Sequence, residues 1–528
     1  MKRAFFLLLV ITLPGFLYAQ DLNLIPYPQQ VKLLKYNLSL AKHCRFYTNN
    51  SRFNYAVDYL NGELAFKDKQ KQTPLQKILI NRDTTRGISG AYTLSISGGV
   101  ISIQAPDSAG VFNGIVTLLQ LYRSAKIEGT KIILPGVTIT DQPRYQWRGF
   151  MFDESRHFFG KGVVKKILKW MAFYKLNRFH WHLTDAQGWR LEVKKFPLLA
   201  TTGGIGNFTD SLASTKYYTQ DDIKEIVSFA KQRNIEIVPE IDMPGHATAA
   251  NHAYPIYSGG TTPGFENFTF NPGKEITYSF ISNILKEVKE VFPGNMIHIG
   301  GDEVTLGIKA WENNPDVKKL MNEKGFTDYK QAEFYFLKRI ADTVQKLNYT
   351  VMCWDEAVAA GLPTNRVVIN WWRQDKPAVL TEALRDGYKV ILCPRLPMYF
   401  DFVQDSTHRS GRKWGKLYNS YTNVYHFPEN SLSDTIYSHG NVIGVQANLW
   451  TETVVSEKRL DYLLFPRLAA LAESGWTNIS MKDDRLFNKR LRAHLDYYAK
   501  AGIYYYDPFN PGYHKEPVDK KAKQEIQD

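Results

Sequence analysis

The sequence predicts an α/β fold, a (β/α)8 TIM barrel preceded by a small α+β domain. From residue 147 onward, apolar strand-like runs alternate with helical segments, which is the pattern of successive βα units. Eight such runs can be counted, the number that closes this kind of barrel. The alternative is an open doubly wound sheet, but the chain has no GxGxxG loop after an early strand. The barrel is therefore the preferred prediction.

Length and composition set the number of domains. The 528 residues are 44% hydrophobic and 14% aromatic, so the chain can bury a large core. Two or three domains are expected at this length. We divide the chain into a signal peptide, an N-terminal α+β domain, the barrel and a C-terminal tail: residues 1–19, 20–141, 142–505 and 506–528.

The first 19 residues have the pattern of a secretory signal. Lys2 and Arg3 precede an apolar stretch over 4–17, and Ala19 marks a cleavage site. The alternative is a membrane anchor, but the stretch is short and contains Pro14, and no later segment offers about 20 apolar residues. We therefore expect export, to the periplasm or outside the cell, without a stable membrane anchor.

Residues 20–141 have a different sequence pattern from the rest of the chain. The runs 92–97 and 100–104 alternate apolar and polar residues, as half-buried strands do, and an amphipathic helix is expected over 108–124. This is the pattern of an α+β domain. The domain boundary is placed at Asp141-Gln-Pro143, because proline ends regular structure and a new pattern begins at once.

The barrel strands and helices follow in order along the chain. The strands are expected at 147–153, 178–184, 235–242, 296–301, 350–354, 367–372, 389–393 and 442–449. Helices are expected at 161–176, 220–233, 276–291, 330–347 and 376–387, and a last apolar helix at 461–475 should pack outside the barrel. The long segment 401–441 is expected to extend over the barrel mouth, and the Lys-rich end 515–523 to be a solvated tail.

Charge and cysteine content exclude some classes of protein. The net charge is +14, but the basic residues are dispersed and form no run of five or six, so nucleic acid is not an expected partner. Three cysteines, Cys44, Cys353 and Cys393, are too few for a disulfide-built fold.

The run Met296 to Val304 carries the most informative chemistry. It delivers two glycines and then two adjacent carboxylates, Asp302 and Glu303, at a strand end. Adjacent carboxylates repel, so one tends to keep its proton to higher pH, which provides an acid and an anion together. The alternative is a solvated turn that opens a helix with Asp302 as its N-cap.

The other strand ends carry related chemistry. Barrels of this type place their active sites at the C-terminal strand ends, so these residues should meet. Carboxylates and tryptophans predominate there, in 153–157, 180–190, 239–246, 354–356, 371–373, 397–401 and 448–452. Indole rings pack on sugar C–H faces and carboxylates bind hydroxyls, so the pattern favours a carbohydrate site.

Several motifs in order resemble those of the family 20 glycoside hydrolases, the β-N-acetylhexosaminidases. They are His298-Ile-Gly-Gly-Asp-Glu303, Arg148-Gly149, Ser155-Arg-His157, His182-Leu-Thr-Asp-Ala-Gln-Gly-Trp-Arg190 and Pro239-Glu-Ile-Asp-Met-Pro-Gly-His246. The early domain, including 110–121, resembles that family's small α+β domain. The resemblance covers nearly the whole expected mature chain.

The resemblance implies an exo-acting enzyme that hydrolyses terminal non-reducing N-acetyl-β-D-hexosamine residues of glycans with retention. The nucleophile is then the acetamido oxygen of the substrate, which forms an oxazolinium ion. Glu303 is implied as general acid/base and Asp302 as the anion that orients the acetamido group. Neither a cofactor nor a metal is implied.

The remaining roles are implied in the same way. Tyr399 donates to the acetamido oxygen, while Asp185 and His246 lie behind Glu303 and tune its proton affinity. The groups that bind the sugar are Arg148 at the 3- and 4-hydroxyls, Asp401 with Glu452 at the 4- and 6-hydroxyls, and the walls Trp354, Trp372 and Trp450. Of Trp371 and Trp372 only one can face inward, and Trp372 is preferred because Arg373 follows it as in the family.

Other functions remain open at this stage. His180-Trp-His182 with His246, His298 and Asp302 could form the site of a metal-dependent hydrolase. The aromatic rim alone would suffice for a non-catalytic carbohydrate-binding protein, and a conventional Asp/Glu retaining mechanism is a third possibility. The histidines His157, His180, His182 and His298 are expected to be structural, and Glu154, Asp355 and Glu356 are left unassigned.

Overall fold

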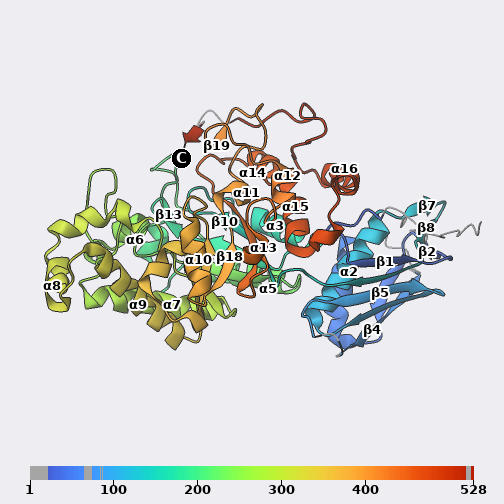
Figure 1. Cartoon of the computed structure of the whole chain (residues 1–528), viewed down its shortest axis with the longest axis horizontal. Helices are drawn as coiled ribbons and strands as arrows, with labels where there is room; N and C mark the ends of the chain where they lie inside the picture. Colours follow the sequence, from blue (N-terminus) through green and yellow to red (C-terminus); the bar gives the residue numbers. More distant parts are fainter. Residues whose placement is uncertain (1–21, 65–73, 84, 86, 519–524, 528) are drawn as a thin grey trace, which may run out of the picture.

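The computed structural model describes residues 22–64, 74–83, 85, 87–518 and 525–527. The expected signal peptide lies outside these residues. The N-terminal domain forms one end of the molecule and the barrel lies beside it (Figure 1).

A six-stranded sheet forms the centre of the N-terminal domain. Its order is β1 (Gln30–Leu33), β9 (Val137–Asp141), β5 (Tyr92–Ser97), β6 (Val100–Ala105), β4 (Leu75–Arg82) and β3 (Arg45–Thr48). A smaller sheet contains β2 (Leu38–Ala41), β8 (Lys131–Leu134) and β7 (Lys126–Glu128). Helices α1 (Asn54–Glu63) and α2 (Ser108–Arg123) complete the domain, and Asp107 caps α2 by accepting from the Gly110 amide.

Eight parallel strands close into a barrel, as predicted. They are β10 (Trp147–Asp153), β11 (Arg178–His182), β14 (Glu236–Glu240), β15 (Met296–His298), β16 (Thr350–Trp354), β17 (Val367–Trp371), β18 (Lys389–Leu392) and β20 (Val442–Leu449). Three expected strands have their exact bounds. The fourth ends at His298, three residues earlier than predicted, so Ile299 to Gly301 belong to the loop that carries the acidic pair.

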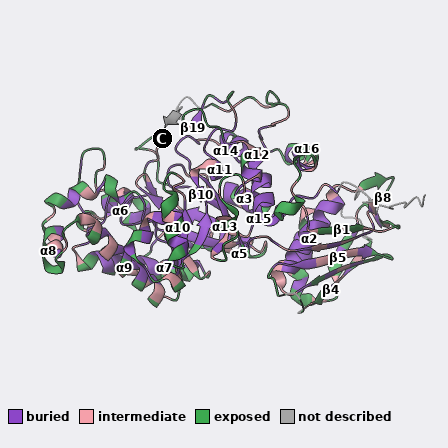
Figure 2. Cartoon of the chain, viewed as in Figure 1, coloured by how far each residue is buried: buried purple, intermediate pink, exposed green. Residues whose placement is uncertain are grey.

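Helices surround the barrel and bury its outer face (Figures 1 and 2). The main ones are α3 (Lys161–Phe173), α5 (Gln220–Lys231), α7 (Glu275–Val291), α8 (Pro315–Lys324), α9 (Tyr329–Lys346), α10 (Pro377–Arg385), α14 (Glu457–Leu464), α15 (Arg467–Trp476) and α16 (Asp484–Lys500). The single helix expected at 461–475 is in fact two, α14 and α15, because Pro466 cannot continue a helix. None of the helices in the described part of the chain has the length and apolarity to cross a bilayer.

The shorter elements lie mostly in the loops. They are β12 (Thr184–Asp185), β13 (Gly188–Trp189), α4 (Leu198–Thr201), α6 (Thr248–Ala253), α11 (Arg395–Met398), β19 (Gly411–Lys413), α12 (Tyr421–Tyr425), α13 (Asp434–Tyr437), β21 (Glu525–Gln527), and the 3-10 turns η1 (Ser51–Phe53), η2 (Pro255–Tyr257), η3 (Val304–Leu306), η4 (Ile308–Asn313), η5 (Asp355–Ala360), η6 (Thr364–Arg366) and η7 (Ile479–Met481).

Buried polar contacts join the two domains. Asp141, at the end of β9, accepts from the Trp476 indole nitrogen at 3.0 Å and lies 3.3 Å from the Lys175 ammonium. Gln120 of α2 donates to the Phe173 carbonyl at 2.8 Å. Because these groups are buried, separating the domains would leave them unpaired, so the contacts hold the N-terminal domain firmly on the barrel.

Candidate functional site

A pocket of about 140 Å³ lies at the C-terminal ends of the barrel strands. Its walls come from loops that follow seven of the eight strands, which is the position expected for a barrel active site. The lining residues are Arg156, His246, Asp302, Glu303, Trp354, Trp372, Arg395, Tyr399, Arg412, Trp450 and Glu452.

Two glycines bring the acidic pair into this pocket. Gly300 and Gly301 have φ values of +69° and +93°, a region that other residues rarely adopt. A Cβ atom on Gly300 would lie 1.7 Å from the Asp242 carboxylate, so no side chain fits there. Glu303 has a left-handed φ of +50° and precedes the 3-10 turn η3, with no side-chain cap. The alternative of an Asp302 helix cap is therefore not what the structure shows.

One histidine joins both carboxylates of the pair. The His246 Nε2 atom lies 3.5 Å from Asp302 Oδ2 and 3.5 Å from Glu303 Oε2. Its Nδ1 atom faces Asp185 at 3.0 Å. Asp185 also binds the Arg156 guanidinium at 2.8 Å, and it is 2% exposed. The order Asp185, His246, Glu303 thus forms a chain of polar contacts from the protein interior to the pocket.

The surroundings shift the pKa values of these groups in different directions. Burial raises the pKa of Asp302 to about 7, and the nearby Glu356 and Glu303 carboxylates add to this effect. The hydrogen bond with His246 lowers the pKa of Glu303, against the effect of its burial. Burial would lower the pKa of His246, but the carboxylates of Asp185, Asp242 and Asp302 outweigh it and hold that pKa well above its usual range.

Aromatic rings form the other walls. The Trp354 indole donates to Glu240 at 2.9 Å and is 1% exposed. Trp372 stacks on Tyr399 with centroids 6.4 Å apart and donates to Glu356 at 3.0 Å. Trp450 lies 6.1 Å from Tyr399. The structure places Trp371 in the main core instead, so Trp372 is the inward-facing ring of that pair.

A buried cluster of histidines lies below the pocket, around Glu240. Its carboxylate is contacted by His182 Nδ1 at 2.5 Å, His180 Nε2 at 2.9 Å and His298 Nδ1 at 3.0 Å. His180, Glu240 and His298 are close enough to share a metal ion, but all three are fully buried and none lines the pocket. A substrate would not reach an ion held there, so this group does not favour a metal-dependent hydrolase.

Two further groups could hold an ion by proximity alone, and both include Asp242. They are His182 with Asp185 and Asp242, and Asp242 with His246 and Asp302. Burial raises the pKa of Asp242 well above its usual range, and the Asp302 charge adds to this. Asp242 therefore holds a proton beside Asp302, which removes the repulsion of a second buried anion.

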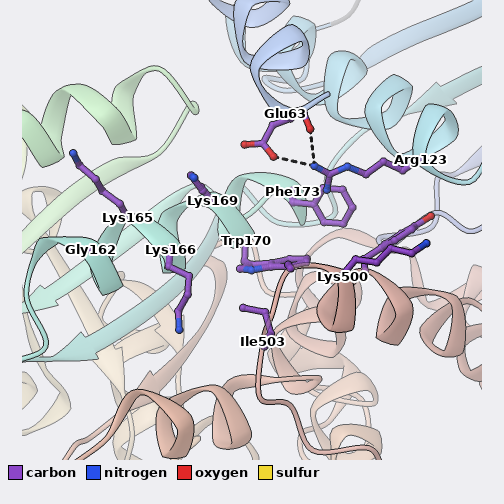
Figure 3. Close-up of a pocket in the computed structure, with 12 residues that line it drawn as sticks. Glu63, Arg123, Gly162, Lys165, Lys166, Lys169, Trp170, Phe173, Lys500 and Ile503 are labelled. Carbon is purple, nitrogen blue, oxygen red and sulfur yellow. Dashed lines mark hydrogen bonds and ion pairs between the residues drawn. The ribbon is translucent and has the colours of Figure 1, made fainter. Parts of the chain in front are cut away.

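A larger cavity of about 560 Å³ lies outside the barrel, between α3, α16 and the N-terminal domain (Figure 3). Its lysines do not converge on one point in Figure 3. Lys165 is paired with Glu225, and Lys166 with Glu457 and Asp461. The carboxylate that lines this cavity, Glu63, is paired with Arg123 at 3.0 Å, so size alone does not mark the catalytic site.

Comparisons with known proteins agree with this geometry. Residues 145–479 match the family model described as glycosyl hydrolase family 20, catalytic domain, and residues 21–142 match domain 2 of the same family. The chain belongs to glycosyl hydrolase family 20. It is a glycoside hydrolase, and the β-N-acetylhexosaminidases are the members of that family to which it is similar.

Named relatives cover most of this family 20 chain. A β-hexosaminidase of Vibrio furnissii is 32% identical over 477 residues, which is 87% of this chain and 77% of the relative. A β-hexosaminidase of Porphyromonas gingivalis is 36% identical over 434 residues, which is 79% of this chain and 54% of the relative. The solved exo β-N-acetylglucosaminidase of Vibrio harveyi, in complex with N-acetylglucosamine, has a TM-score of 0.83 and 31% identity, covering 93% of this chain and 79% of that one.

The structure corrects the assignment of Arg148. This residue is the second of β10, so it lies at the N-terminal end of the barrel, opposite the pocket. Its guanidinium donates to the carbonyls of Lys175 at 2.9 Å and Tyr145 at 2.7 Å. The arginine that follows β10 into the pocket is Arg156, three residues beyond the end of the strand. The motif Ser155-Arg-His157 contains this arginine, and its place after the strand end is the signal that distinguishes it from Arg148.

The structure also corrects the position of Asp401. It is 2% exposed and does not line the pocket, because Arg412 lies between. Arg412 Nε donates to Asp401 at 2.8 Å and Arg412 Nη2 to Glu452 at 3.1 Å. Sequence reasoning missed both Arg412 and Arg395, since they come from loops whose path no local pattern predicts.

Glu154 and Asp355, left unassigned above, and His157, expected to be structural, all have structural contacts. Glu154 accepts from the amides of Phe159 and Gly160, both at 2.9 Å, and fixes the loop before α3. Asp355 binds Arg373 at 3.0 Å. His157 is hydrogen-bonded to the Thr451 carbonyl at 2.6 Å, so it joins two loops and does not line the pocket.

Proposed function

We propose that this chain is an exo-acting β-N-acetylhexosaminidase that removes terminal non-reducing N-acetyl-β-D-hexosamine residues from glycans by substrate-assisted catalysis. The Glu303 carboxylic acid gives its proton to the glycosidic oxygen as the C1–O bond breaks. The acetamido oxygen attacks C1 from the other face and forms an oxazolinium ion. Glu303, now a carboxylate, takes a proton from water, which opens the ring with net retention.

The observation that carries the proposal is the shared contact with His246. Asp302 and Glu303 both approach its Nε2 atom at 3.5 Å, so they lie on one side of the pocket. A two-carboxylate retaining enzyme needs its acid and nucleophile on opposite faces of the sugar. When the nucleophile belongs to the substrate, one residue can serve the bond that breaks and its neighbour the group that attacks.

Asp302 and Tyr399 take the acetamido group in this proposal. Asp302 Oδ1 is buried without a hydrogen-bond partner among the described residues, so it can accept from the acetamido N–H. Tyr399 keeps its hydroxyl proton, because burial raises its pKa well above the usual range, and it can donate to the acetamido oxygen. Trp354, Trp372 and Trp450 enclose the ring and the methyl group.

Substrate binding must reverse the proton affinities of the acidic pair. The Glu303 side chain is 45% exposed, so a sugar that covers it would remove water and raise its pKa. The acetamido N–H would stabilise the Asp302 anion and lower its pKa. Proton transfer from Asp302 to Glu303 upon binding therefore prepares the general acid.

The test is release of p-nitrophenol from p-nitrophenyl N-acetyl-β-glucosaminide. We expect turnover by the wild type and a loss of at least about 10²-fold in kcat for Glu303→Gln and for Asp302→Asn, the range seen for general acid–base and charge-stabilising groups. Binding without turnover in the wild type would instead favour a carbohydrate-binding protein. Near-normal rates for Asp302→Asn would contradict the substrate-assisted mechanism.

A substrate with a hydroxyl in place of the acetamido group separates the two retaining mechanisms. The p-nitrophenyl β-glucoside lacks the internal nucleophile, so we expect no measurable turnover. Comparable rates on both glycosides would favour a conventional Asp/Glu mechanism.

We also propose that the chain is exported, to the periplasm or the exterior. The support is the sequence alone: Lys2, Arg3 and the apolar stretch 4–17. Fractionation of cells that express the full chain, with N-terminal sequencing of the product, tests this. Cleavage near Ala19 is expected, and an uncleaved chain that stays in the cytosol would contradict export.

A further inference from the structure

Arg412 lies where the resemblance to family 20 leads one to expect only hydroxyl-binding carboxylates. It reaches the pocket from β19, in the long segment between β18 and β20. Its fork bridges Asp401 at 2.8 Å and Glu452 at 3.1 Å, and its side chain is 16% exposed. Arg412 therefore replaces Asp401 as the group that faces the pocket.

This arrangement offers a hydroxyl both a donor and an acceptor. The two carboxylates would repel each other without the guanidinium between them. Glu452 Oε2 is buried and has no hydrogen-bond partner among the described residues, although Glu452 lines the pocket. A sugar hydroxyl beside Arg412 can accept from the guanidinium and donate to this oxygen, which satisfies both of its hydrogen-bonding functions.

The backbone of Arg412 is held on two sides. Its amide donates to the Asp401 carbonyl and its carbonyl accepts from the Val403 amide, both at 3.2 Å. The preceding Gly411 has a φ of +129°, and a Cβ atom there would lie 2.9 Å from Val403. The position before Arg412 therefore requires glycine.

The segment after the last barrel helix holds this loop in place. Glu516 belongs to the region expected to be a solvated tail, but its side chain is only 11% exposed. It accepts from the backbone amides of Arg409 at 2.6 Å and Ser410 at 3.0 Å. It also binds Arg459 of α14 at 2.9 Å, and Arg459 in turn donates to the Ser410 carbonyl. Glu516 thus ties the loop that carries Arg412 to a helix of the barrel.

We propose that Arg412 is a specificity-determining residue that reads the sugar hydroxyls remote from the scissile bond, together with Glu452, and that Glu516 is the positioning residue that keeps Arg412 there. The inference rests on the proposed function. It adds a recognition element from the long loop, and it gives the C-terminal segment a role in substrate selection.

The experiment compares p-nitrophenyl N-acetyl-β-glucosaminide with its 4-deoxy and 6-deoxy analogues. A hydrogen bond to a charged group contributes about 1.5–3 kcal/mol, so the wild type should lose about 10- to 150-fold in kcat/KM on at least one analogue. In Arg412→Ala hydrolysis of the parent substrate should become slower, and the penalty for that analogue should fall at least about 3-fold below the wild-type penalty, since the hydroxyl keeps Glu452 but loses the guanidinium. Arg412→Lys keeps the charge but not the fork, and we expect most of the penalty to disappear.

Glu516→Gln should give an intermediate penalty in the full-length chain, because the loop loses its charged anchor while Arg412 is retained. Lys515→Ala is the matched control. Lys515 is the residue next to Glu516 and its side chain is exposed, so this variant should behave as the wild type. If Glu516→Gln does not fold, as judged by circular dichroism, Glu516→Asp replaces it and is expected to show the same trend.

An unchanged penalty in Arg412→Ala, or no penalty in the wild type, would overturn the role of Arg412. A wild-type penalty in a folded Glu516 variant would overturn the role of Glu516. If the wild type does not hydrolyse the parent glycoside, the proposed function fails separately. In that case the affinities for N-acetylglucosamine and its 4-deoxy and 6-deoxy forms are measured by calorimetry in the wild type and in Arg412→Ala. The ratio of the parent to the deoxy affinity in each protein then tests the role of Arg412.

Discussion

The two buried arginines of the β10 region should respond very differently to substitution. Arg156 lines the pocket, whereas Arg148 donates to backbone carbonyls at the opposite end of the barrel. Arg156 Nε has no hydrogen-bond partner among the described residues, and the residue lines the pocket, where its guanidinium can meet a substrate hydroxyl. We therefore predict that Arg156→Ala impairs catalysis and that Arg148→Ala impairs stability.

The magnitude for Arg156 follows from its contacts. Charged hydrogen bonds contribute about 1.5–3 kcal/mol each, and two hydroxyl contacts would give about 3–6 kcal/mol, or about 10²- to 10⁴-fold in kcat/KM. The guanidinium also binds Asp185 at 2.8 Å and lies 4.8 Å over the Trp450 ring, so its loss would disturb the chain that leads to His246. The expected effect is at the upper end of this range.

Arg148 provides the matched comparison. Its removal leaves the carbonyls of Lys175 and Tyr145 without their donors, at a cost of about 1–3 kcal/mol for each buried group. The melting temperature of Arg148→Ala should fall, while kcat/KM at a temperature where it is folded should stay within about 3-fold of the wild type. Steady-state kinetics and thermal melts of both variants test this. A large kinetic loss in folded Arg148→Ala with normal kinetics in Arg156→Ala would refute the reasoning.

Three further predictions concern the acidic pair and its surroundings. Because the pKa of Asp302 is about 7 and its proton is the one that passes to Glu303 on binding, kcat/KM should fall as the pH rises above about 7; in His246→Ala the loss of a cation that lowers this pKa should move the basic limb to higher pH, and a limb at the same or lower pH would contradict it. Gly300→Ala should unfold the site or the protein, because its Cβ would lie 1.7 Å from Asp242; a normal melting temperature and full activity would disagree with this. Treatment with a strong chelator should leave kcat unchanged, and activity lost with the chelator and restored by a divalent ion would instead favour the metal-dependent alternative.

Sequence periodicity was sufficient for the barrel but not for the exact strand ends. Apolar runs mark buried strands, and eight of them left few topologies. The bounds at His298 and Trp371 differed from the expected ones because an apolar run continues into the loop, where Ile299 and Trp372 are buried or half-buried without pairing in a strand. The hydrophobic pattern of the sequence predicts which residues are buried. It does not predict which of them pair by backbone hydrogen bonds in a strand.

The site was predictable where its residues follow directly on a strand. Asp302, Glu303, Trp354 and Trp450 come within five residues of a strand end, and the structure places all four in the pocket. Arg148 lies away from the pocket because it is the second residue of β10, and the N-terminal ends of the strands are at the opposite end of the barrel. Arg412 was missed because its position depends on Glu516, a contact more than a hundred residues away in the chain.

The pocket walls share one mode of support, and it explains why sequence alone did not separate the groups that meet substrate from those that hold them. Glu240 accepts from Trp354, Glu356 from Trp372, and Asp401 from Arg412. Each of these acids fixes the orientation of a donor that faces the pocket. A supporting acid therefore stands as close to a strand end, and is as polar, as an acid that acts on the substrate. The two kinds of acid differ in what they face: a supporting acid accepts from a protein donor, whereas an acting acid faces the substrate. Only the folded structure shows which of the two an acid does.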